Sequence, residues 1–419
     1  MFPLKKTYTT PPAKILPDHE PPKAATMIAG EDIARVLSSK VPCIFVSAAA
    51  APQIISYHFE LENPLDLPKV KRFIPGLAAA FHVEMELVTS DIGHFALQVA
   101  RTERSTLYFK TALLTKTFDG APGLSALLGV DTNNRPLTLN IQEMPHILIG
   151  GTTGGGKSVL LNGMITSLLF KHTPETLNFV MIDPKQVELS IYNSLLHLLK
   201  PIVTDPYKAI DTLGYLCDLM EKRYNMMARK GAKTAAEIGL PSIVVVVDEF
   251  SDLMIVSKKA VEAGIVRIAQ LGRAAGIHLI ISTQQPTVNV ITSLIKANIS
   301  CRIALKTATV NNSMVVLDRK GAEKLTGKGD ALLKLPGEVN PIRFQAPMIE
   351  TADISPVVQI LVEIIATHRP ARLKQPCRVF FCQKWDKWAF VIFREVSYIE
   401  CPIREVIDFL KNDHFSHFI

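Results

Sequence analysis

The sequence lacks long hydrophobic runs, and it contains few cysteines. Its longest apolar stretches, such as 243–247 and 357–365, are far shorter than the ~20 residues that cross a bilayer. Residues 1–6 contain proline and lysine where a secretion signal would have an apolar core. The six cysteines are scattered over 419 residues, which is typical of buried thiols in a reducing compartment. We therefore expect a cytoplasmic protein without membrane insertion.

The charge balance is a weaker constraint on function. Lysine and arginine number 46 and aspartate and glutamate 39, so the formal net charge is +7. This modest excess is compatible with a polyanionic partner but does not require one. The length allows one large domain and a smaller one, each with its own core.

Composition and periodicity divide the chain into four expected parts. Residues 1–26 contain six prolines and few apolar residues, which predicts a disordered or extended arm. Residues 27–105 alternate short helical and strand patterns, and we expect a small α+β module there. Residues 106–352 are expected to form the larger α/β domain. Residues 353–419 are expected to form a small extension whose fold the pattern does not identify.

One glycine-rich stretch in the larger domain indicates a nucleotide site. An apolar strand pattern at 146–149 runs into it and a helical pattern at 159–165 leaves it. Backbone N–H groups of such a loop cradle phosphate oxygens, while its lysine reaches the β- and γ-phosphates and its serine ligates Mg²⁺. The alternative is an ordinary glycine-rich turn, which the flanking strand and helix disfavour. The expected nucleotide-binding residues are Gly151, Thr152, Thr153, Gly154, Gly155, Gly156, Lys157, Ser158 and Val159.

A second apolar strand supplies the carboxylates that hydrolysis needs. Five β-branched residues at 243–247 run into Asp248 and Glu249. A strand that is apolar on both faces belongs in the middle of a parallel sheet. Asp248 is expected to hold Mg²⁺ together with Ser158, and Glu249 to orient the attacking water. The alternative is that the two carboxylates only begin an exposed helix, and the phosphate loop upstream disfavours it.

Further strand patterns complete the expected fold. Apolar runs at 177–182, 276–282 and 301–305 alternate with helical stretches, which predicts a mostly parallel central sheet with helices on both faces. The run at 276–282 ends in Gln284, a polar amide suited to sensing the γ-phosphate. The expected catalytic positions are therefore Lys157, Asp248, Glu249 and Gln284.

Several ordered motifs in the chain resemble one family, the FtsK/SpoIIIE DNA translocases of the RecA-like FtsK–HerA superfamily. The resemblance covers roughly residues 50–350 and so includes the small module. It is carried by the stretches 144–159, 182–190, 247–254, 273–279, 290–299, 321–323 and 327–330.

The resemblance implies a RecA-like P-loop NTPase motor that assembles into a hexameric ring. Double-stranded DNA would pass through the pore, and ATP with Mg²⁺ would bind between subunits. Arg273 sits where the family supplies an arginine to its neighbour's γ-phosphate. Arg267 and Arg302 are less favoured for that role, and an ordinary exposed arginine is the alternative for Arg273.

The chain departs from the family pattern in its pore loops and at its ends. Gln285 stands where relatives often have arginine, and residues 307–314 carry no charge where relatives are often basic. Uncharged groups also bind phosphates, so DNA contact stays possible. No membrane span is evident and no winged-helix domain is recognisable, which favours a stand-alone motor. The expected DNA-contacting residues are Gln285, Thr287, Asn289, Lys306, Asn311 and Asn312.

These observations favour an ATP-dependent double-stranded DNA translocase. The first alternative is an ATPase of the same superfamily in a conjugative-transfer or protein-secretion machine. The second is a nucleotide-dependent clamp that barely turns over. Lys157, Ser158, Asp248 and Glu249 together disfavour the clamp, because all four hydrolytic positions are filled.

Overall fold

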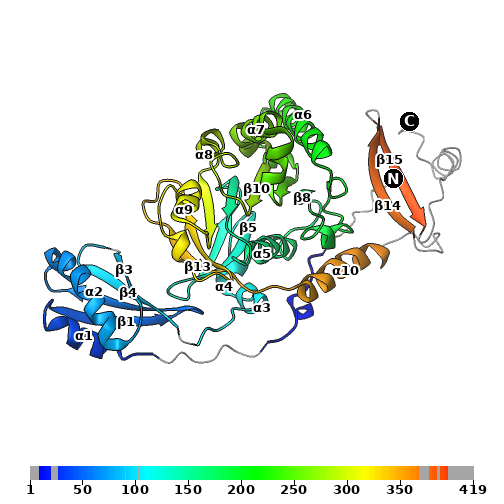
Figure 1. Ribbon diagram of the computed structural model, residues 1–419. Helices are drawn as coiled ribbons and strands as arrows, with labels where there is room; N and C mark the ends of the chain where they lie inside the picture. Colours follow the sequence, from blue (N-terminus) through cyan, green and yellow to red (C-terminus); the bar gives the residue numbers. More distant parts are fainter. Residues whose placement is uncertain are drawn as a thin grey trace. The chain divides into compact units, whose positions relative to one another are not determined.

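The computed structural model describes residues 9–19, 27–89, 91–101, 103–367, 377–384 and 387–394 (Figure 1). The chain divides into two compact units, and each is described by itself. One unit runs from Thr7 to Val362 and contains two sheets. The other contains the hairpin of β14 (Cys377–Lys384) and β15 (Lys387–Arg394), and the rest of the expected C-terminal extension after residue 394 lies outside the described residues.

The small module is a four-stranded antiparallel sheet with two helices. Its strands lie in the order β1-β2-β4-β3, and the aromatic rings of Phe59 and Phe95 stack in its core at 5.2 Å between centroids. The short helical and strand patterns of residues 27–105 predicted a module of this kind, but they did not indicate β1, whose run of alanines has low strand propensity. The elements are α1 (Gly30–Ser38), β1 (Cys43–Ala50), β2 (Ile54–Leu61), α2 (Leu67–Phe81), β3 (Met85–Thr89) and β4 (His94–Ala100).

The larger sheet has nine strands in the described part of the chain. Their order is β6-β5-β13-β12-β11-β7-β10-β9-β8. The five strands from β11 to β8 are parallel to one another, while the other four pair antiparallel, so the sheet is mixed. The strands are β5 (Ser125–Asp131), β6 (Pro136–Asn140), β7 (His146–Gly150), β8 (Leu177–Ile182), β9 (Ser242–Val247), β10 (Ile277–Thr283), β11 (Cys301–Leu305), β12 (Asp330–Lys334) and β13 (Ile342–Gln345).

Helices cover both faces of this sheet, as the sequence predicted. In β9, Val244 and Val246 face a core that contains α5, whereas Val245 and Val247 face a core that contains α6 and α7. Alternate residues of a strand point to opposite faces, so an entirely apolar strand can be buried on both sides. The helices are α3 (Phe109–Leu113), α4 (Lys116–Asp119), α5 (Lys157–Leu169), α6 (Pro206–Lys230), α7 (Phe250–Ala275), α8 (Ser293–Asn298), α9 (Val310–Leu317) and α10 (Thr351–Thr367).

α7 begins at Phe250, directly after Glu249, and the non-helical Ser257 interrupts it. Residues 9–19 fall in the arm that was expected to be disordered or extended, and they are ordered. Leu16 is buried in the core of the larger domain, and Lys110 Nζ donates a hydrogen bond to its carbonyl at 2.8 Å.

A turn between the two sheets joins the small module to the larger domain. Arg343 donates two hydrogen bonds to the buried Asp330 carboxylate, at 2.8 and 3.0 Å, and it forms an ion pair with Glu86 of the small module. In the same turn, the Thr326 hydroxyl donates to Gln53 Oε1. The junction is therefore made of fixed polar contacts.

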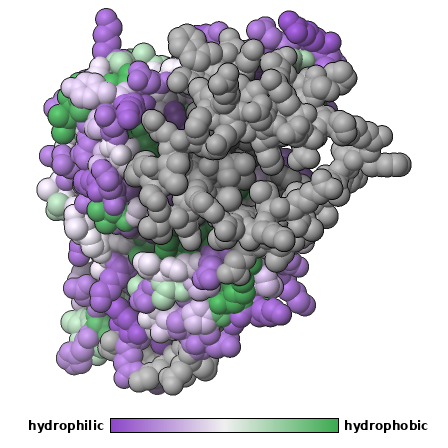
Figure 2. Space-filling model, turned by 90° about the vertical axis from the view of Figure 1, so that its right-hand side faces the viewer, coloured by the Kyte–Doolittle hydropathy of each residue, from purple (hydrophilic) through white to green (hydrophobic). Residues whose placement is uncertain are grey.

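On the described part of the face shown in Figure 2, hydrophilic residues dominate and hydrophobic ones form small, separate patches. Among the helices that the structure describes, none combines the length and the apolar character needed to cross a membrane.

Buried histidines make the stability of this fold depend on pH. His146 opens β7, is 3 % exposed and accepts a hydrogen bond from the Leu279 backbone at Nδ1. Burial, together with the neighbouring His278, lowers the pKa of His146 from 6.5 to about 3. A base whose pKa is lower in the folded state binds protons preferentially when unfolded. Its stabilising contribution is therefore present above pH 6.5 and is lost as the pH falls towards 3.

We predict that His146→Asn, which keeps an acceptor near Nδ1, weakens this pH dependence. Between about pH 7.5 and about pH 5.5 the variant should lose about 1.4 kcal/mol less unfolding free energy than the original chain. Urea unfolding at both pH values measures this difference. Equal losses in the two proteins would show that His146 is not buried in its neutral form.

Candidate functional site

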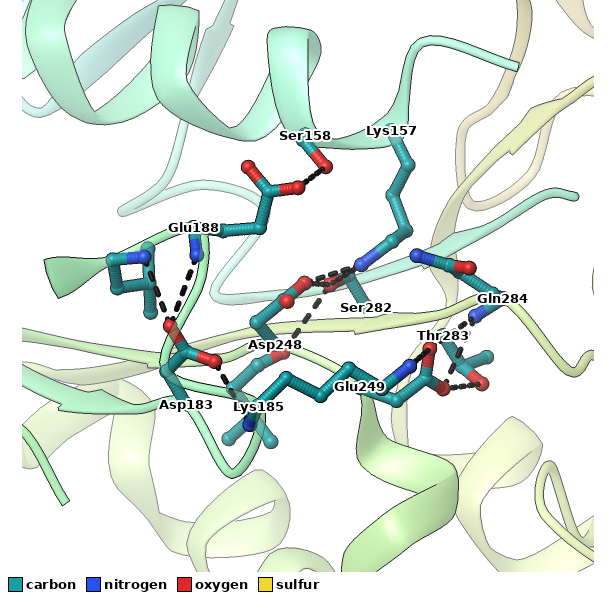
Figure 3. A network of polar contacts seen from close by, with 12 residues as sticks. Lys157, Ser158, Asp183, Lys185, Glu188, Asp248, Glu249, Ser282, Thr283 and Gln284 are labelled. Carbon is teal, nitrogen blue, oxygen red and sulfur yellow. Dashed lines mark hydrogen bonds and ion pairs between the residues drawn. The ribbon is translucent and has the colours of Figure 1, made fainter. Parts of the chain in front are cut away.

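The candidate site lies where four neighbouring parallel strands end. In the sheet register, Gly150 of β7 is beside Thr283 of β10, and Val247 of β9 is beside Ile182 of β8. The residues that follow these strand ends meet at one edge of the sheet (Figure 3). Parallel α/β sheets bind ligands at this carboxyl edge.

The phosphate loop has the conformation that its glycines permit. Gly154 and Gly156 have φ of 79° and 99°, in the left-handed region that favours glycine. A Cβ atom at Gly156 would collide with the backbone nitrogen of Gly329. α5 begins at Lys157, directly after the loop, so its unpaired N–H groups point towards the loop's interior. The loop is shaped to hold an anion such as a phosphate group.

Lys157 connects the loop to the tip of β9. Its side chain is 3 % exposed, and Nζ forms an ion pair with Asp248 Oδ1 and a hydrogen bond to Ser282 Oγ at 3.1 Å. The Ser282 hydroxyl also lies 2.9 Å from Asp248 Oδ1 and donates to it. A buried carboxylate requires such partners, because an unpaired charge there would be strongly unfavourable.

Glu249 is held more tightly than any other acidic residue of the site. Its side chain is 1 % exposed and its φ is 54°. Oε1 accepts hydrogen bonds from the hydroxyls of Ser251 at 2.6 Å and Thr283 at 3.0 Å, and both carboxylate oxygens accept from the Gln284 backbone N–H. Lys185 Nζ lies 3.2 Å from Oε2. Burial alone would raise the pKa of Glu249, but these hydrogen bonds lower it below its ordinary value.

A turn after β8 brings two further side chains to the site. Asp183 is fully buried, and its carboxylate accepts four backbone N–H hydrogen bonds, from Lys185, Gln186, Glu188 and Leu189, at 3.0 to 3.2 Å. Acceptance of so many bonds fixes the turn. From it, Lys185 reaches Glu249, while Glu188 Oε1 accepts a hydrogen bond from Ser158 Oγ at 2.6 Å. Figure 3 shows both contacts.

The residues present suit a nucleotide with a divalent cation. The loop offers backbone N–H groups and the Lys157 ammonium for phosphate oxygens. Ser158 Oγ and Asp248 are the oxygen ligands that Mg²⁺ prefers. Within the described residues no group of three or more histidine, cysteine or acidic side chains forms a metal cluster by itself.

Contacts within the domain link the phosphate loop to the exposed loops that were expected to bind DNA. Thr153 Oγ1 donates to Gln284 Oε1 at 2.8 Å, and both the N–H and the hydroxyl of Thr152 donate to the carbonyl of Lys306, at 2.8 and 3.0 Å. Asn312 Nδ2 donates to the Pro286 carbonyl at 2.9 Å, which joins the two loops to each other. The expected residues on these loops that are exposed are Gln285, Thr287, Asn289, Lys306 and Asn311.

The three arginines considered for action on a neighbour differ in availability. Arg302 is buried and forms an ion pair with Asp318, and Arg267 forms an ion pair with Glu221. Arg273 is exposed near the end of α7, just before β10 begins at Ile277.

Several residues that contact the predicted catalytic residues had no role assigned from the sequence. Among them are Lys185, Glu188, Ser251, Ser282 and Thr283. Ser282 and Thr283 follow the apolar part of β10, and two hydroxyls at the carboxyl end of a buried strand are a usable signal. Lys185 and Glu188 lie in the stretch 182–190 that carries the family resemblance, but their roles depend on how the Asp183 turn folds.

Comparisons with known proteins agree with this geometry. The family model for the FtsK/SpoIIIE family matches residues 110–239 and 232–288. A DNA translocase FtsK of Campylobacter jejuni (strain 81-176) is 37% identical over 332 residues, 75% of this chain and 35% of that protein. A DNA translocase FtsK of Streptococcus agalactiae is 39% identical over 332 residues, 74% of this chain and 40% of that protein. The chain thus spans less than half the length of these relatives.

Two solved structures have a similar fold. The pCW3 conjugation coupling protein TcpA, in a monomer form with ATPγS, aligns with a TM-score of 0.57 and 23% identity, over 80% of this chain and 97% of that chain. The cytoplasmic domain of the Thermomonospora curvata Type VII secretion ATPase EccC aligns with a TM-score of 0.50 and 28% identity, over 57% of this chain and 31% of that chain. The larger sheet has the fold of P-loop ATPase motor domains, and the chain belongs to the FtsK/SpoIIIE family.

Proposed function

We propose that this chain is the motor part of an ATP-hydrolysing translocase that moves double-stranded DNA through a hexameric ring. The observation that carries the proposal is the complete set of hydrolytic side chains at one sheet edge, Lys157, Ser158, Asp248 and Glu249. Relatives described as DNA translocases support the choice of cargo.

The proposed hydrolysis assigns one task to each side chain. Backbone N–H groups of the phosphate loop and Lys157 bind the phosphates of ATP, which is the substrate. Ser158 and Asp248 would hold Mg²⁺, which neutralises charge on the phosphate oxygens. Glu249 orients the attacking water through a carboxylate that is already fixed by its neighbours. Phosphoryl transfer needs mainly such positioning and electrostatic stabilisation.

Arg273 acts on the site of a neighbouring subunit in this proposal. Arg273 precedes β10 and the site follows it, so the seven residues of the strand separate them. At ~3.3 Å per residue this places Arg273 on the order of 20 Å from its own site. A ring built from heterologous contacts would bring it to the next subunit's γ-phosphate.

The exposed loops are the proposed DNA contacts. Gln285, Thr287, Asn289, Lys306 and Asn311 supply amide, hydroxyl and ammonium groups for phosphate oxygens, with Asn312 bracing the loops. Thr152 and Thr153 connect these loops to the phosphate loop. Changes in the bound nucleotide would thereby reach the DNA.

The first test is steady-state ATP hydrolysis with and without linear double-stranded DNA. We expect duplex DNA to stimulate the original chain, and both Lys157→Ala and Glu249→Gln to lower turnover by about 100-fold or more. ATP hydrolysis that duplex DNA does not stimulate would contradict the DNA-translocase proposal. It would favour an ATPase of a secretion or conjugative-transfer machine. A chain that binds ATP without turnover would favour the clamp.

The second test asks whether Arg273 acts between subunits. Arg273→Ala should lower turnover by about 10³-fold, the usual scale for an arginine finger. Mixing it with Lys157→Ala chains should restore activity, because about a quarter of the interfaces in an equal mixture then combine an intact phosphate loop with an intact arginine. Lys157→Ala mixed with Glu249→Gln is the control, since both changes lie in one site. Failure of the first mixture to recover would place Arg273 outside the reaction.

A further inference from the structure

Among the groups that donate to the Glu249 carboxylate, Lys185 differs because its side chain is not held in the core of the larger domain. The other donors are the buried hydroxyls of Ser251 and Thr283 and the backbone N–H of Gln284. These three are set by β10 and by the first turn of α7. The Lys185 side chain is 41% exposed and reaches Glu249 Oε2 from the Asp183 turn.

The distribution of donors over the two carboxylate oxygens gives this contact its importance. Oε1 accepts from the hydroxyls of Ser251 and Thr283, at 2.6 and 3.0 Å, which uses both of its lone pairs. The Gln284 N–H lies 3.2 Å from Oε1 and 3.3 Å from Oε2, so the two oxygens share it. Lys185 donates to Oε2 at 3.2 Å. Oε2 is therefore the less occupied oxygen, and Lys185 is the side chain that contacts it.

The Asp183 turn holds Lys185 in place for this task. Asp183 accepts the backbone N–H of Lys185 itself at 3.2 Å, so the backbone that carries the lysine is anchored. Gln186, the next residue, adopts the left-handed region with φ of 59°, which bends the chain sharply after the lysine. The nearby negative charges of Asp248 and Asp252 add to the attraction that draws the ammonium group towards the site.

We propose that Lys185 is a positioning residue for hydrolysis, which orients Glu249 Oε2 towards the attacking water. The inference rests on the proposed function, because it needs Glu249 to act on that water. A misdirected carboxylate would lower turnover without weakening ATP binding, since Lys185 is not one of the groups that bind phosphate in this site.

The experiment compares Lys185→Met, which keeps the length of the side chain without its charge, with Lys185→Arg, which keeps the charge. Lys222→Met, on the exposed surface of α6, is the matched control. Each full-length variant is assayed for ATP hydrolysis over a range of ATP concentrations, with and without duplex DNA, and for thermal unfolding. The Lys185→Met change is also made in the Glu249→Gln background.

We expect Lys185→Met to lower kcat by about tenfold to a hundredfold with KM changed less than about twofold. The melting temperature should change little, because the Glu249 carboxylate keeps its hydrogen bonds from Ser251, Thr283 and Gln284 when Lys185 is lost. Lys185→Arg should restore most of the turnover, and Lys222→Met should resemble the original chain. In the Glu249→Gln background, Lys185→Met should cause no further loss, because both changes act through one carboxylate.

An unchanged kcat in Lys185→Met would overturn the inference, and so would a loss that lowers the melting temperature and that arginine does not rescue. A further loss in the Glu249→Gln background would also overturn it. If duplex DNA does not stimulate turnover, only the DNA-motor proposal is contradicted. The Lys185 variants can still be compared by their basal hydrolysis. An original chain that hydrolyses no ATP overturns both proposals.

Discussion

Three buried carboxylates at one edge of the sheet determine how the rest of the site is built. Asp183, Asp248 and Glu249 are each at most 1 % exposed. Removal of a charged carboxylate from water costs several kcal/mol unless charges and hydrogen-bond donors replace the water. The chain supplies backbone N–H groups to Asp183, Lys157 and Ser282 to Asp248, and hydroxyls with Lys185 to Glu249. The contacts that satisfy these buried carboxylates are therefore the same contacts that assemble the site.

The same requirement explains which features the sequence predicted. An apolar strand that runs into a glycine-rich loop or into two carboxylates has a local pattern, so the sequence predicted β7 and β9 close to their bounds. The structure brings the predicted site residues Lys157 and Asp248 into contact at the ends of these strands. The roles of Lys185 and Glu188 depend on how the Asp183 turn folds, and four backbone hydrogen bonds to one side chain leave no periodic signal. Sequence patterns report burial and propensity, whereas these contacts depend on long-range geometry.

The fold was predictable to a similar extent and for similar reasons. Buried strands with β-branched residues on both faces were placed within one or two residues of their bounds. β1 was missed because alanine packs in strands only when neighbouring strands provide the surface. The sheet was expected to be mostly parallel, and five of its strands are parallel to one another, while β5, β6, β12 and β13 pair antiparallel. The predicted hydrolytic residues lie at the carboxyl ends of the parallel strands, so the antiparallel strands do not alter the proposed site.

The turn at residues 326–330 has a mechanical consequence. The Gly329 N–H donates to the Gly155 carbonyl of the phosphate loop at 2.9 Å, while Thr326 and Asp330 in the same turn are tied to Gln53 and Arg343. A displacement of the phosphate loop therefore either breaks these polar bonds or carries the turn with it. Because Arg343 also pairs with Glu86, the turn contacts both the phosphate loop and the small module. The phosphate loop is thus connected to the small module by a short chain of hydrogen bonds and one ion pair.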